Sequence, residues 1–255
     1  MKTVGTLIGI VSSFILHGQD SIKTEIDTLF SKSGSIEKIT YKTYERKKIV
    51  YYDHGKVIKA VNYKNGQRDG SYECFGDSAK ILSSANYENG LLSGPNVLFF
   101  KNESKHVVAN YKNNKLDGTY IVYNRKGTIK SETDFKEGKR EGKFITYYEN
   151  GTKQYIGTYK NDRMYGERLC YTENGDFLTG DYIAYNDVGQ VEITGKCING
   201  KPEGKWKVYS GRQLSYTVSF KEGKPDGLVV YTARKNSELY RNGVFVKELK
   251  DKITN

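Results

Sequence analysis

A glycine recurs at fixed spacing through most of this 255-residue chain, and the same short sequence accompanies it each time. The first five of these glycines, from Gly70 to Gly166, follow one another at intervals of 24 residues. Each stands seven residues after an aromatic side chain, or after Cys197 in one unit, with a polar segment such as KNGQRD between them. The repeating glycines are Gly70, Gly94, Gly118, Gly142, Gly166, Gly204 and Gly227. Such a period is typical of repeat proteins, in which each unit packs against its neighbours.

One unit of this array is shorter than the others. The interval from Gly166 to Gly204 is 38 residues, and Gly180 lies within it, where GDYIAY matches the GTYIVY that begins at Gly118. Gly180 therefore follows Gly166 by 14 residues instead of 24. We interpret this as a unit that has lost part of its returning strand and loop, and we expect a kink in the array or a distinct surface there.

Two turns divide each unit into a pair of strands. The first turn carries residues that tolerate positive φ, such as Asn65-Gly66 and Glu137-Gly138, as tight hairpins require. The second turn falls nine residues after the unit glycine, at Gly127, Gly151, Gly175 and Gly189. Between the turns lie β-branched and aromatic runs, which predict strands. The chain is therefore predicted to be all-β, an elongated single-layer antiparallel sheet of tandem 24-residue β-hairpin repeats.

Aromatic side chains stand at two fixed offsets from the unit glycine. Rings two residues after it are Tyr72, Tyr120, Phe144, Tyr182 and Trp206, and rings five residues after it are Phe75, Phe99, Tyr123, Tyr147, Tyr171, Tyr185 and Tyr209. Successive strand residues point to opposite faces, so the two offsets predict a column of rings on each face. Cross-strand aromatic pairs contribute about 0.2–1 kcal/mol each, and we expect them to replace a thick apolar core.

The ends of the chain differ from the repeats. Met1-Lys2 is followed by an uncharged run, residues 4–16, and then by the polar sequence HGQD, which predicts a secretory signal peptide over residues 1–19. The alternative is an ordinary first helix. We expect residues 20–44 to form a cap with a short helix and then a strand, residues 45–245 to form the repeat array, and residues 246–255 to form a tail. The signal predicts export to the periplasm, the cell envelope or the medium.

The chain carries a net charge of +11, of which Lys2 would leave with the signal peptide. The seven loops that end at a repeating glycine contribute only +3 of this charge. A continuous phosphate-binding stripe should be more one-sided, so nucleic acid and anionic lipid are disfavoured as partners. Basic residues gather near the start of the array, among them Lys38, Lys42, Arg46, Lys47 and Lys48.

The sequence contains no catalytic or metal-binding motif, and we expect neither enzymatic activity nor a cofactor. The acids that precede the unit glycines are Asp69, Asp117, Glu141, Glu203 and Asp226. They could form a ladder of cation ligands, but one acid per unit favours acceptors for loop N–H groups. The three cysteines, Cys74, Cys170 and Cys197, fit neither a disulfide framework nor a zinc site, and we expect Cys74 and Cys170 to be small apolar fillers.

The pattern aromatic-K-[NE]-G-K-x-[DE]-G-x-aromatic resembles the MORN repeat, in the variant found in bacterial antitoxin-like proteins of the YwqK type. The resemblance covers residues 45–245. It implies a row of β-hairpins that contacts protein or lipid, and it implies neutralisation of a toxin as one role.

These observations favour an exported, non-enzymatic module that binds another protein, a toxin being one such partner. The alternatives are a structural or adhesive component of the cell envelope and a membrane-surface protein that binds anionic lipid. Exposed aromatic rings are the usual anchors of protein interfaces, and they are densest around the shortened unit. The predicted partner-binding residues are Tyr165, Tyr171, Tyr182, Tyr185, Trp206 and Tyr209. The sequence does not predict an oligomeric state.

Overall fold

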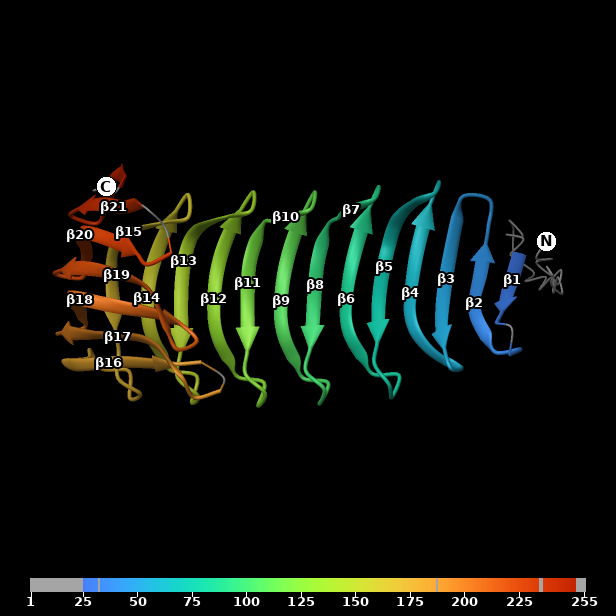
Figure 1. Cartoon of the computed structure of the whole chain (residues 1–255), viewed down its shortest axis with the longest axis horizontal. Coiled ribbons are helices and arrows are strands. Elements are labelled where there is room, and N and C mark those ends of the chain that lie inside the picture. Colours follow the sequence, from blue (N-terminus) through green and yellow to red (C-terminus); the bar gives the residue numbers. More distant parts are fainter. Residues whose placement is uncertain (1–24, 32, 187, 234–235, 251–255) are drawn as a thin grey trace, which may run out of the picture. The chain divides into compact units, whose positions relative to one another are not determined.

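The computed structural model describes residues 25–31, 33–186, 188–233 and 236–250, and every regular element in these ranges is a β-strand (Figure 1). The predicted signal peptide, residues 1–19, lies outside the described residues. The described part contains no helix long and apolar enough to cross a membrane. The chain divides into two compact units, residues 1–115 and 116–255. The predicted all-β class with tandem antiparallel hairpins is confirmed.

Unit 1 is a single antiparallel sheet in which strands that follow one another in sequence are paired, except that β6 pairs with both the two-residue β7 and β8. Its strands are β1 (Glu25–Phe30), β2 (Ile36–Lys42), β3 (Arg46–Asp53), β4 (Lys56–Lys64), β5 (Gln67–Phe75), β6 (Ile81–Glu88), β7 (Leu91–Leu92), β8 (Gly94–Phe99) and β9 (Lys105–Lys112), and the two-residue β10 (Lys115–Leu116) lies at the boundary with unit 2. The short helix expected after residue 20 is wrong over residues 25–30, because this segment pairs with β2 as a strand. The sheet therefore begins before residue 45, where the repeat array was expected to start.

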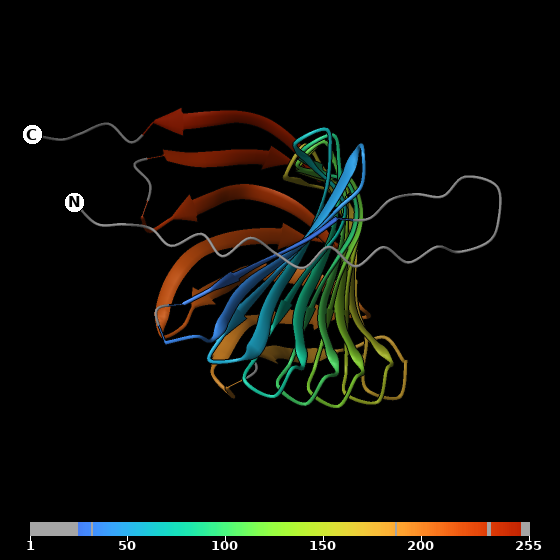
Figure 2. The same ribbon diagram turned by 90° about the vertical axis from the view of Figure 1, so that its right-hand side faces the viewer.

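Unit 2 contains two antiparallel sheets (Figure 1). Strands β11 (Gly118–Tyr123), β12 (Ile129–Lys136), β13 (Lys139–Tyr147), β14 (Lys153–Lys160) and β15 (Arg163–Cys170) follow one another in the first sheet. The second sheet consists of β16 (Gly180–Tyr185), β17 (Val191–Ile198), β18 (Lys201–Ser210), β19 (Gln213–Lys221), β20 (Lys224–Tyr231), β21 (Asn236–Arg241) and β22 (Val244–Lys250). Because β22 reaches Lys250, pairing continues beyond residue 245, where a tail was expected. In Figure 2 the strands of the second sheet, orange to red, form a curved layer.

The hairpin turns have the backbone conformation that the sequence predicts. Asn65 and Gly66 have φ of 49° and 81°, and Glu137 and Gly138 have φ of 50° and 84°, as a two-residue type I′ loop requires. All eight unit glycines, the one of the shortened unit included, also have positive φ, between 67° and 140°. These eight are Gly70, Gly94, Gly118, Gly142, Gly166, Gly180, Gly204 and Gly227. Their recurrence in the sequence therefore reflects a backbone requirement.

Successive units are joined at these turns by a repeated pair of hydrogen bonds. The carboxylate of Asp117 accepts a bond from the backbone N–H of Glu137 at 3.2 Å, and Gly138 N–H donates to the carbonyl of Leu116 at 2.7 Å. The same carboxylate bond joins Asp69 to Asn89, Glu141 to Asn161, Glu203 to Glu222 and Asp226 to Asn242. The acids therefore act as acceptors for loop N–H groups, as predicted, and each fixes the turn of the next unit.

Rings of neighbouring strands pack edge to face, as the ring columns predict. Tyr72 contacts Tyr87 with centroids 6.1 Å apart, and Tyr120 contacts Phe135 at 5.9 Å. Phe144 meets Tyr159 at 5.8 Å and Trp206 meets Phe220 at 5.5 Å, both also edge to face. In each pair the ring two residues after a unit glycine contacts the aromatic residue that opens the following loop. Such pairs are worth about 0.5–1.5 kcal/mol beyond the area they bury.

The shortened repeat, which begins at Gly166, ends the first sheet of unit 2. Beyond Cys170 the chain returns only as a loop with the bridge between Tyr171 and Phe177, so no returning strand covers the outer edge of β15. The backbone N–H groups of Gly166, Arg168 and Cys170 on that edge instead donate to three carbonyls at 2.9, 2.8 and 2.6 Å. The acceptors are Gly243, Gly223 and Gly200, the second residues of three alternate hairpin turns of the second sheet, which join β21 to β22, β19 to β20 and β17 to β18. The edge is therefore capped by the sheet that follows it.

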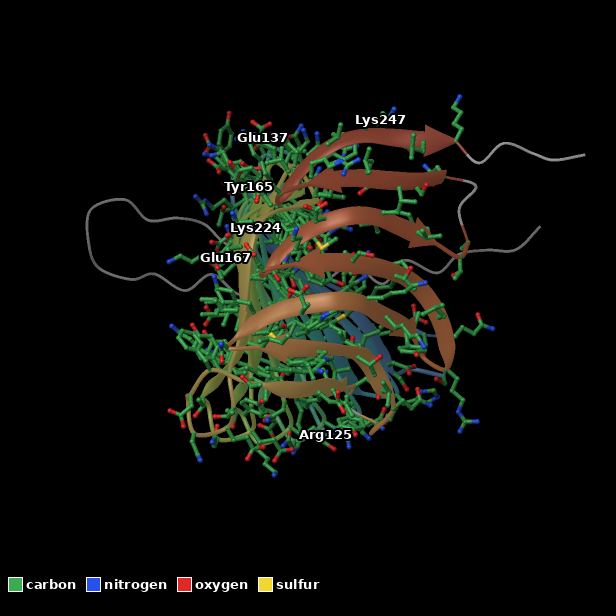
Figure 3. All side chains as sticks on the ribbon, turned by 90° about the vertical axis from the view of Figure 1, so that its left-hand side faces the viewer. Arg125, Glu137, Tyr165, Glu167, Lys224 and Lys247 are labelled. Atoms are coloured by element: carbon green, nitrogen blue, oxygen red, sulfur yellow. A yellow bond between two sulfur atoms is a disulfide. The ribbon has the colours of Figure 1, made fainter. Side chains whose placement is uncertain are left out.

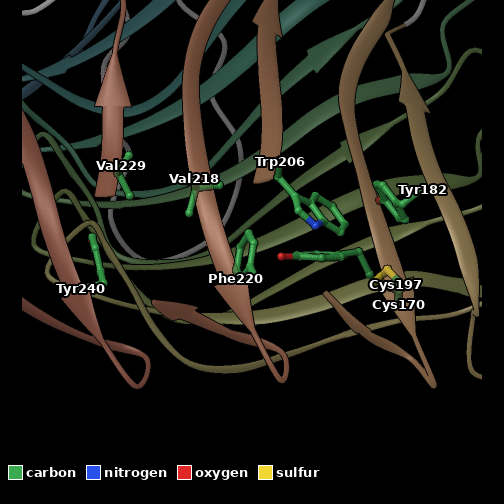
Figure 4. Close-up of a cluster of buried hydrophobic side chains, with 9 residues drawn as sticks. Cys170, Tyr182, Cys197, Trp206, Val218, Phe220, Val229 and Tyr240 are labelled. Atoms are coloured by element: carbon green, nitrogen blue, oxygen red, sulfur yellow. A yellow bond between two sulfur atoms is a disulfide. The ribbon is translucent and has the colours of Figure 1, made fainter. Parts of the chain in front are cut away.

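A buried cluster lies where the two sheets of unit 2 pack together (Figure 4). It consists of Tyr155, Cys170, Tyr182, Cys197, Trp206, Val218, Phe220, Val229 and Tyr240. The sequence predicted one layer without such a core, and this holds for unit 1. Unit 2 differs because its second sheet covers the ring-bearing face of β13 and β14, as the contacts of Phe144 and Tyr155 with the cluster show.

Candidate functional site

Two of the six predicted partner-binding residues lie in the core. Tyr182 is 3% exposed and Trp206 is 2% exposed. Their rings are 5.0 Å apart, and both contact Tyr155 of the first sheet, at 5.7 and 5.9 Å. The prediction that Tyr182 and Trp206 form an exposed anchor is therefore wrong, because these rings lie on the face of the second sheet that packs against the first sheet. Burial also raises the pKa of the Tyr182 hydroxyl well above its ordinary value.

The other four predicted residues remain at the surface to different degrees. Tyr185, at the end of β16, is 54% exposed, and Tyr165 on β15 is 42% exposed. Tyr171 is half-buried and stacks on Phe177 at 5.4 Å, and Tyr209 on β18 is half-buried. Tyr165 and Glu167 project from the same side of β15 (Figure 3). The predicted residues therefore do not form one surface, and Tyr185 is the exposed ring of the second sheet among them.

A groove of about 560 Å³ runs over β16, β17 and β18 of the second sheet. Its outward side chains are Asp181, Ile183, Thr194, Lys196, Ile198, Glu203, Lys205 and Lys207, and the backbones of Gly195 and Gly204 complete it. Ile183 and Ile198 are 46% and 45% exposed, which is high for large aliphatic side chains. Strand alternation places Tyr185 on the same face of β16 as Ile183. We call these residues together with Tyr185 the outer groove.

The outer groove combines apolar and charged side chains. Lys196, Lys205 and Lys207 are exposed, and so is Asp181. The carboxylate of Glu203 accepts the backbone N–H of Glu222, so it is already engaged within the repeat. The groove thus offers two isoleucines and a tyrosine beside three ammonium groups. Apolar anchors within a charged rim are the usual composition of a protein interface.

A second hollow of about 440 Å³ lies between the two sheets of unit 2. Its lining is Arg140, Tyr159, Asn161, Asp162, Arg163, Met164, Tyr216, Tyr231, Glu238 and Tyr240. Its charges are largely paired, since Arg140 Nε contacts Asp162 at 3.3 Å and Arg163 Nε lies 3.9 Å from Glu238. The Tyr240 hydroxyl also donates to Glu238 at 3.0 Å. Of these contacts, the one between Arg163 of β15 and Glu238 of β21 joins the two sheets, and we assign the hollow a structural role.

Arg168 is a buried residue that the sequence reasoning missed. It stands two residues after Gly166, in the slot where other units carry a ring, and it is 2% exposed. Its guanidinium lies 5.0 Å from the centre of the Tyr159 ring and donates to the carbonyl of Thr158 at 3.1 Å. No carboxylate of the described residues pairs with it. The departure from an aromatic residue at this slot is the signal that could have identified it.

A disulfide joins Cys170 of β15 to Cys197 of β17, with Cα atoms 6.6 Å apart. The expectation that no cysteines are paired and that Cys170 is a simple filler is therefore wrong. The two residues are 27 apart in sequence and belong to different sheets, so no spacing rule within one repeat reveals them. Cys74 remains a free, half-buried thiol.

The two histidines in the described part have local contacts. His54 occupies a hairpin turn with φ of 46° and lies 2.8 Å from the carboxylate of Asp53. His106 packs against Phe100 with ring centroids 4.2 Å apart. Within the described ranges, no group of three or more His, Cys, Asp or Glu side chains is placed to hold a metal ion.

Comparison with solved structures gives only weak likenesses. A Staphylococcus aureus TarM mutant in complex with Fondaparinux, alpha-GlcNAc-glycerol and UDP is 15% identical, with 42% of this chain and 21% of that chain covered and a TM-score of 0.29. Another TarM crystal structure gives 15% identity, 41% and 22% coverage and a TM-score of 0.28. The Photorhabdus luminescens Tc holotoxin pore gives 9% identity, 85% and 14% coverage and a TM-score of 0.18. This chain thus spans about a fifth of the TarM chains, and such TM-scores support no structural relationship.

The family comparison is informative. No curated protein matches the chain. The family model of the MORN repeat variant matches residues 47–65 and 140–161. Both segments contain a hairpin turn or the loop that leads to one, and they lie in different units of the chain. Together with the repeated turns, glycines and rings described above, these matches show that the chain contains repeats of the MORN variant at residues 47–65 and 140–161.

Proposed function

We propose that this chain is an exported, non-enzymatic repeat protein that binds another protein through the outer groove. MORN repeats are commonly protein- or lipid-binding modules. The single observation that carries the proposal is the exposure of Ile183, Ile198 and Tyr185 beside three lysines on one sheet face. Aliphatic and aromatic side chains of this size are rarely left uncovered together without a binding role.

The composition of the outer groove favours a protein over a lipid surface or nucleic acid. A site for phosphate groups needs a concentrated excess of cations, whereas Asp181 and Glu203 stand among the lysines here. Protein interfaces instead use apolar anchors with charges of both signs around them. The finer form of the proposal, in which the bound protein is a toxin, is supported only by the resemblance to the antitoxin-like members of the family.

The Cys170–Cys197 disulfide supports the exported part of the proposal. Structural disulfides form and persist in oxidising compartments and are rare in the reducing cytosol. The test is to produce the chain from Met1 in a bacterial host and to measure the mass and thiol content of the product in each cell fraction. We expect an exported product that lacks the N-terminal segment and has one alkylatable thiol, Cys74, after denaturation. A full-length cytoplasmic product with three free thiols would contradict export.

The binding part is tested by capture with the immobilised chain from an extract of the native organism, followed by mass spectrometry. Ile183→Glu places a charge among the apolar anchors, and Tyr185→Ala removes the exposed ring. Val246→Glu is the matched control, because Val246 is 50% exposed on β22 of the same sheet but outside the outer groove. We expect a partner that is retained by the wild type and by the control and lost by both groove variants. A partner retained equally by all four proteins would refute the assignment of the site.

The toxin form of the proposal has its own measurement. The captured partner is purified and its effect on growth or on a target enzyme is measured with increasing amounts of the chain. Neutralisation that saturates at a fixed stoichiometry and fails with Ile183→Glu is the expected result. A captured protein without toxic activity would remove the toxin form and leave the binding proposal intact.

A further inference from the structure

A second surface lies in unit 1, on the face of the sheet that carries Tyr63, Tyr72, Tyr87 and Tyr111. We call it the tyrosine face. In unit 2 the corresponding face of β13 and β14 is covered by the second sheet through Phe144 and Tyr155. Unit 1 consists of one sheet, so no second layer of its own covers its tyrosine face. The strand register shows which charged residues lie on this face.

Three rows of paired residues cross β2, β3, β4 and β5 on the tyrosine face. The first row is Lys42, Lys47, Tyr63 and Arg68, the second is Thr40, Ile49, Val61 and Tyr72, and the third is Lys38, Tyr51, Lys59 and Cys74. Within β2–β5 these rows contain five cations and no carboxylate, and their continuation on β1 places Asp27 beside Thr40. On β2, β3 and β4 the outer rows are four residues apart, which corresponds to about 13 Å. The register thus gathers on one face the charge that the sequence shows only as a cluster along the chain.

The neighbouring cations lie on the opposite face of the sheet. Arg46 pairs with Lys64, and Lys48 pairs with Tyr41 and Asn62, in rows that alternate with those of the tyrosine face. The basic cluster at the start of the array is therefore divided between two faces. The cations of the same strands on the opposite face can therefore be substituted as a control for the substitution of those on the tyrosine face.

The cations of the tyrosine face lie against its rings. The ammonium group of Lys59 is 4.2 Å from the centre of the Tyr51 ring, and that of Lys47 is 6.0 Å from the Tyr63 ring. The guanidinium of Arg68 lies 5.2 Å from the Tyr87 ring. Apart from the pair between Lys42 and Asp27 of β1, the described ion pairs include none of these cations. Ile49 and Val61 of the middle row are buried between the two rows of cations. The guanidinium of Arg68 also donates to the hydroxyl of Tyr87 at 3.3 Å, so the face presents its positive charge beside tyrosine rings.

The same face becomes uncharged on the next strands. Its residues on β6, β8 and β9 are Ser83, Ala85, Tyr87, Gly94, Asn96, Leu98, Val107, Ala109 and Tyr111. Leu98 is 41% exposed, and both tyrosines are half-buried. The tyrosine face therefore has a basic half on β2–β5 and an apolar, tyrosine-containing half on β6–β9.

We propose that the tyrosine face of unit 1 binds an acidic segment of a partner protein whose carboxylates meet the basic half and whose adjoining apolar side chains cover the other half. A polyanion such as nucleic acid or an acidic polysaccharide would use the basic half alone, because the apolar half offers it no charge. A protein segment supplies both chemistries side by side. This surface is separate from the outer groove, so the two proposals stand or fall independently.

The test uses the full chain and two labelled synthetic peptides of equal negative charge. One peptide is a run of glutamates followed by a leucine- and alanine-rich segment, and the other contains glutamates and serines only. Affinities are measured by fluorescence anisotropy at low and at physiological salt, because attraction between exposed charges is screened by salt. We expect the acidic–apolar peptide to bind about tenfold or more tightly than the purely acidic one, with the difference lost in Leu98→Asp.

The triple variant Lys47→Glu, Lys59→Glu and Arg68→Glu should weaken binding of the acidic–apolar peptide about tenfold or more. Circular dichroism confirms that each variant is folded, and replacement of the same residues by Gln, with a smaller loss of the same direction, serves if the Glu variant does not fold.

The control triple variant Arg46→Glu, Lys48→Glu and Lys64→Glu changes the net charge by the same amount on the opposite face. Binding within about twofold of the wild type is expected for it, because its changes do not touch the tyrosine face. An equal loss in both triple variants would show that net charge alone attracts the peptide, and it would overturn the proposal. So would equal affinity for the two peptides, or binding of duplex DNA, heparin or anionic vesicles to the tyrosine-face cations when the peptide does not bind.

Discussion

The packing of Trp206 against Gly195 gives a sharp test of the two-sheet core. The indole of Trp206 on β18 packs on Gly195 of β17, and a Cβ added at Gly195 would lie 2.1 Å from the Cδ2 atom of that ring. The φ angle of Gly195 is not positive, so an alanine can adopt the same backbone conformation. Any loss of stability in Gly195→Ala must therefore come from displacement of Trp206.

The size of the effect follows from the contacts of the ring. Trp206 is 2% exposed and touches Tyr155, Tyr182 and Phe220. Overpacking of a dense core costs about 1–3 kcal/mol and sometimes more. Complete removal of a buried Trp costs about 3–5 kcal/mol, which sets an upper bound for pushing it aside. We expect Gly195→Ala to lower the free energy of unfolding by about 2–4 kcal/mol.

Urea denaturation followed by tryptophan emission is the suitable assay, because Trp206 is the single Trp of the chain. The wild type should show blue-shifted emission that is protected from acrylamide, and Gly195→Ala should show red-shifted emission and a lower midpoint. In the double variant with Trp206→Leu, followed by circular dichroism, the two losses should be less than additive by about 1 kcal/mol or more. Gly76→Ala is the control, since its nearest neighbour is the flexible end of Leu82. An unchanged midpoint and emission in Gly195→Ala would refute the core described here.

Three further predictions concern stability. Cys170→Ser removes a cross-link that closes a 27-residue loop and should cost about 3–4 kcal/mol, measured by urea denaturation with and without reductant. Burial raises the pKa of Tyr182 and Tyr216. Above pH ~10 the unfolded chain therefore loses these protons while the folded chain keeps them. The contribution of these two tyrosines to the free energy of unfolding should be constant below pH ~10. Above that pH it should fall by up to about 1.4 kcal/mol per pH unit for each tyrosine. Glu141→Ala removes the carboxylate that accepts the turn N–H of Asn161 and should cost about 1 kcal/mol by thermal or urea denaturation, whereas Glu141→Gln, which keeps an acceptor, should cost less.

Much of the fold follows from local chemistry that is visible in the sequence. Paired residues such as Asn65-Gly66 require positive φ, and only a tight hairpin places two such residues between strands. The acid before each unit glycine recurs because the next turn needs an acceptor for its N–H group, as Asp117 and Glu137 show. These interactions repeat with the sequence, so the sequence reveals them.

The parts that escaped prediction depend on contacts between segments that no repeat relates. Tyr182 and Trp206 occupy the same slot as Tyr72, yet they are buried because a different sheet lies over them. The Cys170–Cys197 bond and the buried Arg168 arise at the same meeting of two sheets. The repeat pattern shows the positions of these residues within each repeat. It does not show the second layer, which changes the environment of those positions.

The shortened unit explains why the second layer forms in unit 2. A full unit would return along β15 and pair with the N–H groups of Gly166, Arg168 and Cys170, and the array would continue in one sheet. With ten fewer residues before Gly180 there is no such strand, and three unpaired donors would remain on an edge beside buried rings. Unpaired buried donors are costly, so the edge must find other acceptors. The turn carbonyls of Gly243, Gly223 and Gly200 meet this need, and they can approach only because these turns carry glycine, since a Cβ at Gly223 would lie 2.9 Å from the carbonyl oxygen of Arg168. A deletion in one repeat thus gives the turn glycines of three later repeats a second role, as the residues whose carbonyls fix the second sheet on the first.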